Sequence, residues 1–435
     1  MASGRQTRTE AAIQRLRRSM DVALDQAPWL LVNIPGWLAG AALRRLKSAP
    51  LDRGLLNHGR IRSILVTRVD GLGDLVIFAP FLQCLRMQFP GAWISLVVDE
   101  KLQDFMASCP WVDEVIGFDE SGSKYARTFL ACFRAWRLAA RRLHAERFDL
   151  AITPRWDVDS RAALFIGYFS LARRHVGFTE KTTKRRSILN RGSNRLLSHI
   201  VDGSAEPSHE YNRNREILER LEIPLSGEAG ELWLTADDIA WAERALRCAG
   251  SRTDQPVVCF GIGAVEAKRM WPTEYFAETA RWLIDTLDAN IVVVGDGRDR
   301  AYAEWLRKAA GPRVVNFAGT CSLARSAAII RHCDLYIGND SGPMHIASAA
   351  GVPVVEISCH PGDGSANHVN SPVRYRPRSA HSVVLQPRTA RSPCRDACMA
   401  STAHCILDVT PRDAQQSIEA LLETHSGAGL RRCPA

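Results

Sequence analysis

The chain has 435 residues, of which 46% are hydrophobic and 24% are charged, and its formal net charge is +9. This length allows two domains, because single hydrophobic cores stop growing near ~250–300 residues, and the composition is typical of a globular protein. Residues 1–62 hold eleven Lys and Arg against four Asp and Glu, so the rest of the chain is close to neutral. The distribution argues against a basic nucleic-acid-binding body and indicates a basic arm with an acidic or membrane-surface partner.

The cysteines indicate a reducing compartment. Twelve of them are spread along the chain without a framework of close pairs, and the first twenty residues contain no apolar run that resembles a signal peptide. We therefore expect a cytoplasmic protein with buried, reduced thiols. No stretch reaches the ~20 apolar residues that a membrane-spanning helix needs.

Residues 1–60 are predicted to form a basic, helical N-terminal extension. The stretch 27–47 is broken by Pro35 and by glycines, but it can lie on a bilayer with Trp29 and Trp37 at the interface. The same aromatic spacing is also typical of a helix that packs on a neighbouring domain. Both alternatives stay open, and the first would make the protein peripheral on the cytoplasmic face of the inner membrane.

From residue 62 onward, strand-like and helix-like patterns alternate. Such alternation predicts a parallel, doubly wound sheet, here in an N-terminal Rossmann-like domain over 61–230. The segment 181–228 is polar, basic and poor in apolar residues until a short helix at its end. The predicted strands are 63–69, 92–99, 113–118 and 148–154, and the predicted helices are 75–89 and 125–146.

A second set of alternating strands and helices begins near residue 256 and predicts a C-terminal Rossmann-like domain over 250–425. The α/β fold class is therefore two parallel-sheet domains that face each other across a cleft, with ligands beyond the carboxyl ends of the strands. The predicted strands are 256–263, 289–297, 313–319, 333–340 and 353–358, and the predicted helices are 273–287, 299–309, 322–332 and one after residue 340.

Polar residues follow the strand 333–340 at the mouth of the next helix. Free N–H groups there make an anion site, Gly342 allows a close backbone approach, and Ser341 adds a hydroxyl donor. Asp340 can accept from a sugar hydroxyl, and His345 can donate to a phosphoryl oxygen. A capped helix with an ordinary buried histidine is the alternative for any one of these residues.

The ends of two other strands add charge. Lys268 and Arg269 follow the strand 256–263, and cations there can neutralise a leaving diphosphate without a metal ion. Asp296 and Asp299 lie beside two glycines after the strand 289–297, where they suit contacts to a ribose or a base. Three strand ends together predict a nucleotide site.

The stretch DGLGDLV after the first strand does not complete a dinucleotide fingerprint, because Val76 stands where G-x-G-x-x-G needs its third glycine. Its other feature is Asp74, a carboxylate at the start of a helix. Such a group is suited to take a proton from an acceptor hydroxyl, although an isolated acid at this place is more often a helix cap.

The chain resembles glycosyltransferase family 9, the ADP-heptose:lipopolysaccharide heptosyltransferases. The matching segments follow the family's order over roughly residues 62–425, and the last of them is the most specific. They are ILVTRVDGLGDLVIFAPFLQCLR, HEYNRNREILERLEIP, KRMWPTEYFAETARWL and FAGTCSLARSAAIIRHCDLYIGNDSGPMHIASAAGVPVVEI.

The resemblance implies a GT-B fold that needs no metal ion or other cofactor and inverting transfer of heptose from ADP-heptose onto a lipopolysaccharide core. Asp74 matches the family's catalytic base, and the phosphate-contacting lysine falls on Lys268 or Arg269. The usual spacing, two residues before Trp271, falls on Arg269, whereas a one-residue shift at Met270 would give Lys268, so both alternatives stay open. The donor-binding motif matches Asp340, Ser341, Gly342 and His345.

The acceptors of the family are anionic, lipid-linked glycans, and the chain has a basic run that suits them. Lys184, Arg185 and Arg186 lie in a segment that can hold carboxylates and phosphates, with a solvated loop as the alternative. Other readings are a family member that uses another nucleotide sugar, one that binds nucleotide sugar or glycolipid without turnover, and a membrane-surface module that rests on the basic arm alone.

A group of metal-ligand residue types lies near the C-terminus. Cys394, Cys398, His404 and Cys405 fall within twelve residues, and three thiols with one histidine can bind zinc. The C-x3-C spacing and the adjacent His-Cys do not match the spacing of common zinc sites. From the sequence we therefore expect no metal.

Overall fold

The computed structural model describes residues 58–119, 127–224, 232–250 and 255–425, which form two compact units. The first unit contains the described parts of 1–70, 81–206 and 212–227, and the second contains those of 71–80, 207–211 and 228–435. The proposed membrane-surface arm lies almost wholly outside the described residues. Within the described part of the chain, no helix is both long and apolar enough to cross a membrane.

The first unit is built on a sheet of six parallel strands in the order β3-β2-β1-β4-β5-β6. The strands are β1 Ser63–Arg68, β2 Trp93–Asp99, β3 Glu114–Phe118, β4 Leu150–Thr153, β5 Arg174–Phe178 and β6 His199–Val201. The helices that begin between residues 58 and 224 are α3 Leu72–Gln88, α4 Gln103–Met106, α5 Arg127–Arg141, α6 Ala163–Phe169, α7 Lys184–Leu189 and α8 Glu210–Arg220. The first residues of α3 and α8 group with the second unit.

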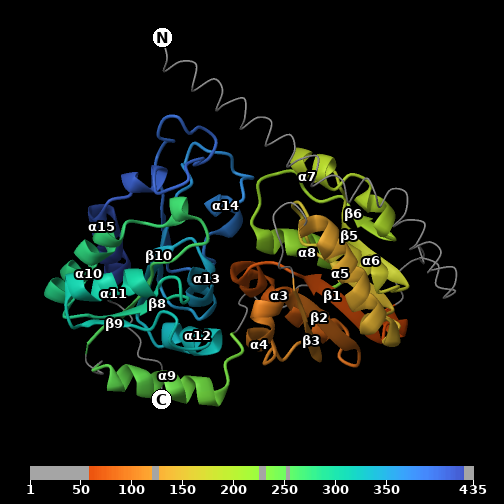
Figure 1. Cartoon of the computed structure of the whole chain (residues 1–435), viewed down its shortest axis with the longest axis horizontal. Coiled ribbons are helices and arrows are strands. Elements are labelled where there is room, and N and C mark those ends of the chain that lie inside the picture. The colour runs from red at the N-terminus through yellow and green to blue at the C-terminus, as the bar shows by residue number, and fades with distance from the viewer. Residues whose placement is uncertain (1–57, 120–126, 225–231, 251–254, 426–435) are drawn as a thin grey trace, which may run out of the picture. The chain divides into compact units, whose positions relative to one another are not determined.

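The second unit has a sheet of six parallel strands in the order β12-β11-β10-β7-β8-β9. The strands are β7 Val257–Gly261, β8 Asn290–Val294, β9 Val314–Asn316, β10 Leu335–Asn339, β11 Val354–Ile357 and β12 Ser382–Leu385. Its helices are α9 Ala236–Cys248, α10 Thr273–Leu287, α11 Arg300–Ala310, α12 Leu323–Arg331, α13 Gly342–Ala349, α14 Pro372–Tyr375 and α15 Pro411–His425 (Figure 1).

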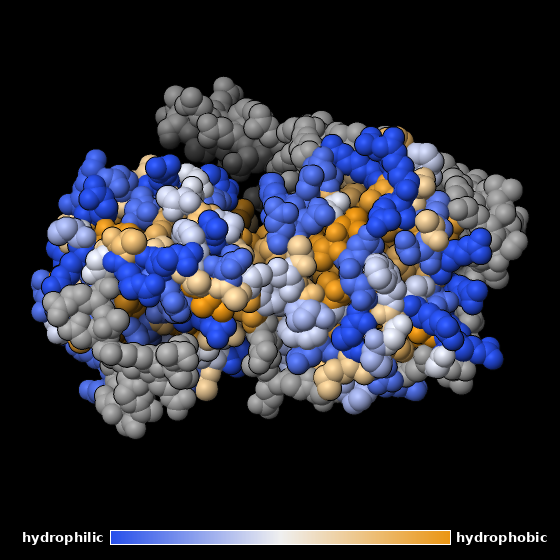
Figure 2. Space-filling model, turned by 90° about the horizontal axis from the view of Figure 1, so that it is seen from below, coloured by the Kyte–Doolittle hydropathy of each residue, from blue (hydrophilic) through white to orange (hydrophobic). Residues whose placement is uncertain are grey.

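Both sheets have the same winding. Counted within each unit, the strand order is 3-2-1-4-5-6, the order of the Rossmann fold, so the predicted fold class is confirmed. The central strands are buried on both faces, as parallel sheets covered by helices require. The cores of the two units are separate clusters, and hydrophilic residues cover much of the surface of each unit in Figure 2.

The segment 181–228 differs from its prediction. It was expected to have little to bury, but it contains α7 and β6, and β6 pairs with β5 as Val176 lies opposite His199. These elements are short, so their apolar residues are too few to give a readable period. The strands β5, β6 and β12 were not predicted, and each lies in the outer part of its sheet.

The short segment 207–211 packs within the second unit through charged and aromatic contacts. Glu210 and Arg374 form a buried ion pair at 2.7 Å, and the guanidinium of Arg378 lies 3.4 Å from the centre of the Tyr211 ring. Burial of an ion pair is favourable only where the geometry is good, and both guanidinium contacts of Arg374 reach one carboxylate oxygen of Glu210. Glu210 and Tyr211, from the motif HEYNRNREILERLEIP, therefore anchor the segment to the second unit.

Candidate functional site

The strand order of the second sheet points to one edge. Chain connections run outward in opposite directions from β7 and β10, which are neighbours, and ligands of such sheets bind beyond the carboxyl ends at this switch point. The loop that follows β7 carries Lys268 and Arg269, and the loop that follows β10 carries Asp340 and Ser341. The structure therefore brings together residues that lie about seventy positions apart in the sequence.

Glycines let the two strands approach at this edge. Gly261 and Gly338 are opposite each other in the ladder between β7 and β10. A Cβ on Gly261 would overlap the buried ring of Tyr336, and a Cβ on Gly338 would overlap the carbonyl oxygen of Gly261. Larger residues would push the strands apart exactly where the loops of the site begin, so these positions require glycine.

Asn339 links the loops of the site and was not singled out from the sequence. Its side chain is fully buried, donates to the carbonyl of Ile262 at 2.7 Å and accepts from the N–H of Trp271 at 2.9 Å. The amide thus ties the end of β7 to the segment that follows Arg269. A buried Asn at the end of an apolar strand was the available signal, since such an amide needs partners.

Arg269 and Asp340 form the central ion pair. Arg269 Nη2 lies 2.8 Å from Asp340 Oδ2, and the same nitrogen donates to the backbone carbonyl of Asp340. Burial acts to lower the pKa of Arg269, but Asp340 together with the weaker effects of other acidic groups outweighs it and holds that pKa above its ordinary value. Burial also raises the pKa of Asp340, although Arg269 opposes the shift. The guanidinium is therefore committed to this pair.

Lys268 has a different environment. Both cations belong to the short helix η6, Ala267–Arg269, but the Lys268 ammonium lies 3.4 Å from Glu266, whose side chain is half exposed. A single exposed carboxylate holds a flexible ammonium only weakly. Of the two cations between which the sequence could not choose, Lys268 is thus the one that can move to a ligand.

A neutral acid lies beside the central pair. Glu356 in β11 is fully buried, and neither of its carboxylate oxygens has a hydrogen-bond partner among the described residues. Burial raises the pKa of Glu356 well above its ordinary value, and the charge of Asp340 adds to the shift. The protonated form of Glu356 is therefore favoured. A neutral Glu356 does not compete with Asp340 for the ion pair with Arg269.

The N-terminus of α13 presents the predicted donor motif. Ser341 is the N-cap residue, α13 begins at Gly342, and the side chain of Ser341 makes no capping hydrogen bond to it. Helix N-termini attract anions because their first N–H groups lack partners within the helix. The predicted transition from strand to helix at this motif is thus found, with an available anion-binding end.

His345 lies in the first turns of α13 and is buried. Burial lowers its pKa to about 3, and the nearby His209 and Arg269 add to the shift. The imidazole is therefore neutral near pH 7, so that it can donate a hydrogen bond but adds no charge. Asp340, Ser341, Gly342 and His345 lie along one turn, as the sequence predicted.

The start of α3 lies in the same unit and contacts α13. The segment 71–80 groups with the second unit, and within it a Cβ on Gly73 would overlap the imidazole of His345. A Cβ on Gly342 would likewise overlap the side chain of Leu72. Asp74 is half-buried in the first turn of α3, beside these contacts, so the two glycine-containing turns that the sequence singled out separately are neighbours.

Asp70 differs from Asp74 although it opens the same DGLGD stretch. Its carboxylate binds Arg155 at 2.5 Å and Arg68 at 3.0 Å, and all three belong to the first unit. Burial acts to raise the pKa of Asp70, but Arg155, Arg68 and Arg161 together outweigh it and lower the pKa below its ordinary value. Asp70 is thus a permanently ionised anchor, poorly suited to take up a proton.

Asp296 and Asp299 follow β8 and do different work. The exposed carboxylate of Asp296 pairs with Arg298 at 2.5 Å, which lowers the pKa of Asp296. Asp299 lies against Gly263 and Gly295, where a Cβ would overlap its carboxylate, and accepts from the N–H of Asp296 at 3.0 Å. Asp299 therefore shapes the loop, and Asp296 stands at the surface.

The three residues of the predicted acceptor-binding run differ in their exposure. Lys184 and Arg185 are exposed, but Arg186 is fully buried in the first unit. Its guanidinium donates to the backbone carbonyls of Arg155, Asp157 and Phe178. The expectation that Arg186 contacts an acceptor is corrected, because its donors are used to hold three chain segments together.

Two parallel sheets with the Rossmann strand order and a helix that begins at a strand end are typical of α/β proteins of the GT-B type. The family model "Glycosyltransferase family 9 (heptosyltransferase)" matches residues 136–395, so the chain belongs to this family and is a glycosyltransferase.

Relatives and solved structures agree with this assignment. The chain is 28% identical to lipopolysaccharide heptosyltransferase 2 of Escherichia coli K12 over 386 residues, which cover 82% of this chain and 98% of the relative. A family 9 glycosyltransferase from Veillonella parvula has a TM-score of 0.70 at 22% identity over 86% of this chain and 100% of that chain. The E. coli ADP-heptose lps heptosyltransferase II has a TM-score of 0.63 at 19% identity over 83% and 99%. The protein is thus related to the lipopolysaccharide heptosyltransferases.

Proposed function

We propose that the protein transfers heptose from ADP-heptose onto an anionic, lipid-linked acceptor of the lipopolysaccharide-core type, with inversion at the anomeric carbon. The observation that carries the donor half is the meeting of Arg269, Asp340 and the α13 N-terminus at the switch point between β7 and β10. A relative with 28% identity is named a lipopolysaccharide heptosyltransferase, which favours the same chemistry here.

In this proposal the diphosphate of the donor binds at the N-terminus of α13. The first N–H groups of the helix and the ammonium of Lys268 stabilise the charge that the diphosphate gains as it leaves. Neutral His345 donates a hydrogen bond without adding charge. Arg269 holds Asp340 in place, so that its carboxylate can accept from a hydroxyl of the donor.

Asp74 is the proposed general base. It takes the proton from the acceptor hydroxyl as that oxygen attacks the anomeric carbon, and the bond to the diphosphate breaks on the opposite face. Its position next to the contact between Gly73 and His345 places it close to the α13 turn. Asp70 is excluded from this role by its two arginine partners.

The proposed acceptor contacts are Lys184 and Arg185, which are exposed at the start of α7. Charge-assisted hydrogen bonds to carboxylates and phosphates are the interactions that their side chains can make. Membrane association through residues 1–60 and a location on the cytoplasmic face of the inner membrane complete the proposal.

The nucleotide is tested by calorimetric titration of the full chain with ADP, UDP and GDP, each with and without added Mg²⁺. We expect ADP alone to bind tightly, with an affinity that Mg²⁺ leaves unchanged, because protein cations and N–H groups replace the metal. A preference for UDP or GDP would keep the glycosyltransferase and discard ADP-heptose as the donor. Absence of binding to all three would favour a member without turnover.

A further inference from the structure

An irregular segment of the second unit buries three cysteines although about half of its residues are exposed. Between the end of β12 at Leu385 and the start of α15 at Pro411, the only regular element is the four-residue 3-10 helix η7, Cys405–Asp408. Loops of this length without secondary structure are uncommon in compact domains and need something to order them. The hydrophobic core nevertheless includes Cys394, Cys398 and Cys405 from this segment.

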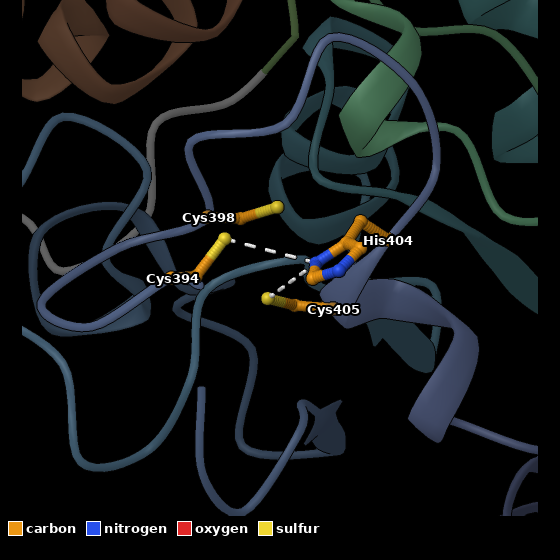
Figure 3. A group of neighbouring side chains, drawn as sticks. All are labelled: Cys394, Cys398, His404 and Cys405. Carbon is orange, nitrogen blue, oxygen red and sulfur yellow. Dashed lines mark hydrogen bonds between the residues drawn. The ribbon is translucent and has the colours of Figure 1, made fainter. Parts of the chain in front are cut away.

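The fold gathers four ligand-type side chains there. The Sγ atoms of Cys394, Cys398 and Cys405 and a ring nitrogen of His404 all lie within 4.8 Å of one another. Figure 3 shows the three sulfur atoms and the imidazole turned toward a common space. The cysteine side chains are almost wholly buried, at 8%, 1% and 0% exposure.

The distances fit a tetrahedral metal centre. Nδ1 of His404 lies 3.7 Å from Cys394 Sγ and 3.5 Å from Cys405 Sγ. In a tetrahedron with zinc–sulfur bonds of about 2.3 Å and zinc–nitrogen bonds of about 2.0 Å, the edge between sulfur and nitrogen is about 3.5 Å. The backbone N–H of Met399 also donates to Cys394 Sγ at 3.3 Å, a contact that supports a thiolate ligand.

We propose that Cys394, Cys398, His404 and Cys405 bind one zinc ion in a closed, structural site that orders the segment 386–410. The set of three thiolates and one imidazole matches structural zinc sites, which keep no open position for a substrate. Thiolate-rich tetrahedral sites also suit iron, so the choice of zinc is part of what is tested.

The site supports the loop of the candidate donor site. The helix η7 contacts η6, which carries Lys268 and Arg269. Just beyond η7, the carbonyl of Val409 accepts from the indole N–H of Trp271 at 2.7 Å, and the backbone of Trp271 is held in turn by Asn339. A metal ion that fixes η7 would therefore hold the loop that carries Lys268 and Arg269 in place. The ion itself would take no part in the transfer.

The metal content of the full chain, purified without a metal-affinity step, tests the proposal by inductively coupled plasma mass spectrometry. We expect one zinc per chain in the wild type and in the control Cys333→Ala, a buried cysteine outside the cluster. We expect loss of at least about nine-tenths of the zinc in Cys398→Ala and His404→Ala, because three ligands leave the site open. His404→Cys, which restores a fourth ligand, should keep the metal.

A second measurement does not depend on the folding of the variants. Replacement of the metal by Co²⁺ in the wild type should give the visible absorption of tetrahedral cobalt with thiolate ligands. Stoichiometric iron in place of zinc would overturn the choice of metal. Wild-type protein without any bound metal, whether its thiols are free or joined in a disulfide, would overturn the site, and neither result bears on ADP binding.

Discussion

Asp70 and Asp74 lie on either side of the Gly71-Leu72-Gly73 turn but differ in burial. Asp70 is held by Arg68 and Arg155, whereas Asp74 is half-buried at the start of α3. We expect Asp74→Asn to lower kcat by about 10²–10⁴, because the base acts in the transition state. Single-turnover transfer assays measure this loss.

A measurement of ADP binding shows whether the Asp74→Asn variant has lost only the catalytic step or also its folded donor site. Asp74→Asn should bind ADP within about twofold of the wild type, since the lost interaction belongs to the transition state. Asp104→Asn, an exposed acid in the first turn of α4, serves as the control and should keep full activity. An equal loss of ADP affinity in Asp74→Asn would show that the carboxylate binds the donor instead.

Lys268 and Arg269 should respond differently to truncation. Lys268→Ala is expected to weaken ADP binding about 10- to 100-fold with little change in stability, because a charge-assisted contact to phosphate is worth about 1.5–3 kcal/mol. Arg269→Ala should lower the free energy of unfolding by about 3–5 kcal/mol, because it leaves Asp340 buried and unpaired. Calorimetry and urea denaturation measure the two effects.

Lys308→Ala, an exposed lysine in the last turn of α11, controls for the loss of one positive charge. It should change neither ADP affinity nor stability. If Arg269→Ala were stable and lost ADP binding while Lys268→Ala bound normally, the roles of the two cations would be exchanged.

At the scale of the elements, the pairing of β7 with β10 depends on glycine. We expect Gly261→Ala to lower the free energy of unfolding by about 1–3 kcal/mol, because its methyl group would overlap Tyr336 in a packed core. Gly297→Ala is the matched control, since a Cβ there meets nothing within 4 Å. Urea denaturation of both variants measures the difference.

A double variant tests whether the overlap with Tyr336 is what destabilises Gly261→Ala. Tyr336→Phe removes the hydroxyl that the new methyl group would meet first, so the double variant should recover part of the lost stability. Strictly additive effects of the two substitutions would argue that Gly261→Ala acts by another route, such as a change in the unfolded chain.

At the scale of the whole molecule, the partly buried His209 links stability to pH. Burial lowers the pKa of His209 to about 4, although its hydrogen bond to the carbonyl of Arg376 opposes the shift. Between about pH 4 and 6.5 the unfolded chain therefore binds a proton that the native His209 does not, so this group makes stability fall as the pH falls.

His209→Gln tests this linkage. Glutamine takes no proton, so the variant should lose about 1–2 kcal/mol less stability than the wild type between pH 7.5 and pH 5. The comparison is made between the two proteins because buried acids such as Glu356, with a raised pKa, change stability in the opposite direction. Parallel pH profiles from urea denaturation would show that His209 binds its proton as readily in the folded protein as in the unfolded chain.

Local pattern was sufficient for most of the fold. Apolar runs of strand length alternate with amphipathic helices, and this alternation predicted β1 to β4 and β7 to β11 in their correct places. The outer strands β5, β6 and β12 were missed because their apolar residues lie directly beside polar and basic ones, as in RRHVGF and HSVVL, so no apolar run stands out. The family motifs were also readable, since each consists of contiguous residues at the end of a strand.

The tertiary structure decided which residues far apart in the chain become partners. It placed Asp340 on Arg269 rather than on Lys268, turned Arg186 inward onto three carbonyls, and joined Asn339 to Trp271. It also brought Cys394 and His404 together despite a spacing that did not suggest a metal site. The physical reason is that a parallel sheet makes neighbours of strands separated by whole helices, so the charge and burial of each side chain depend on crossovers that no local pattern records.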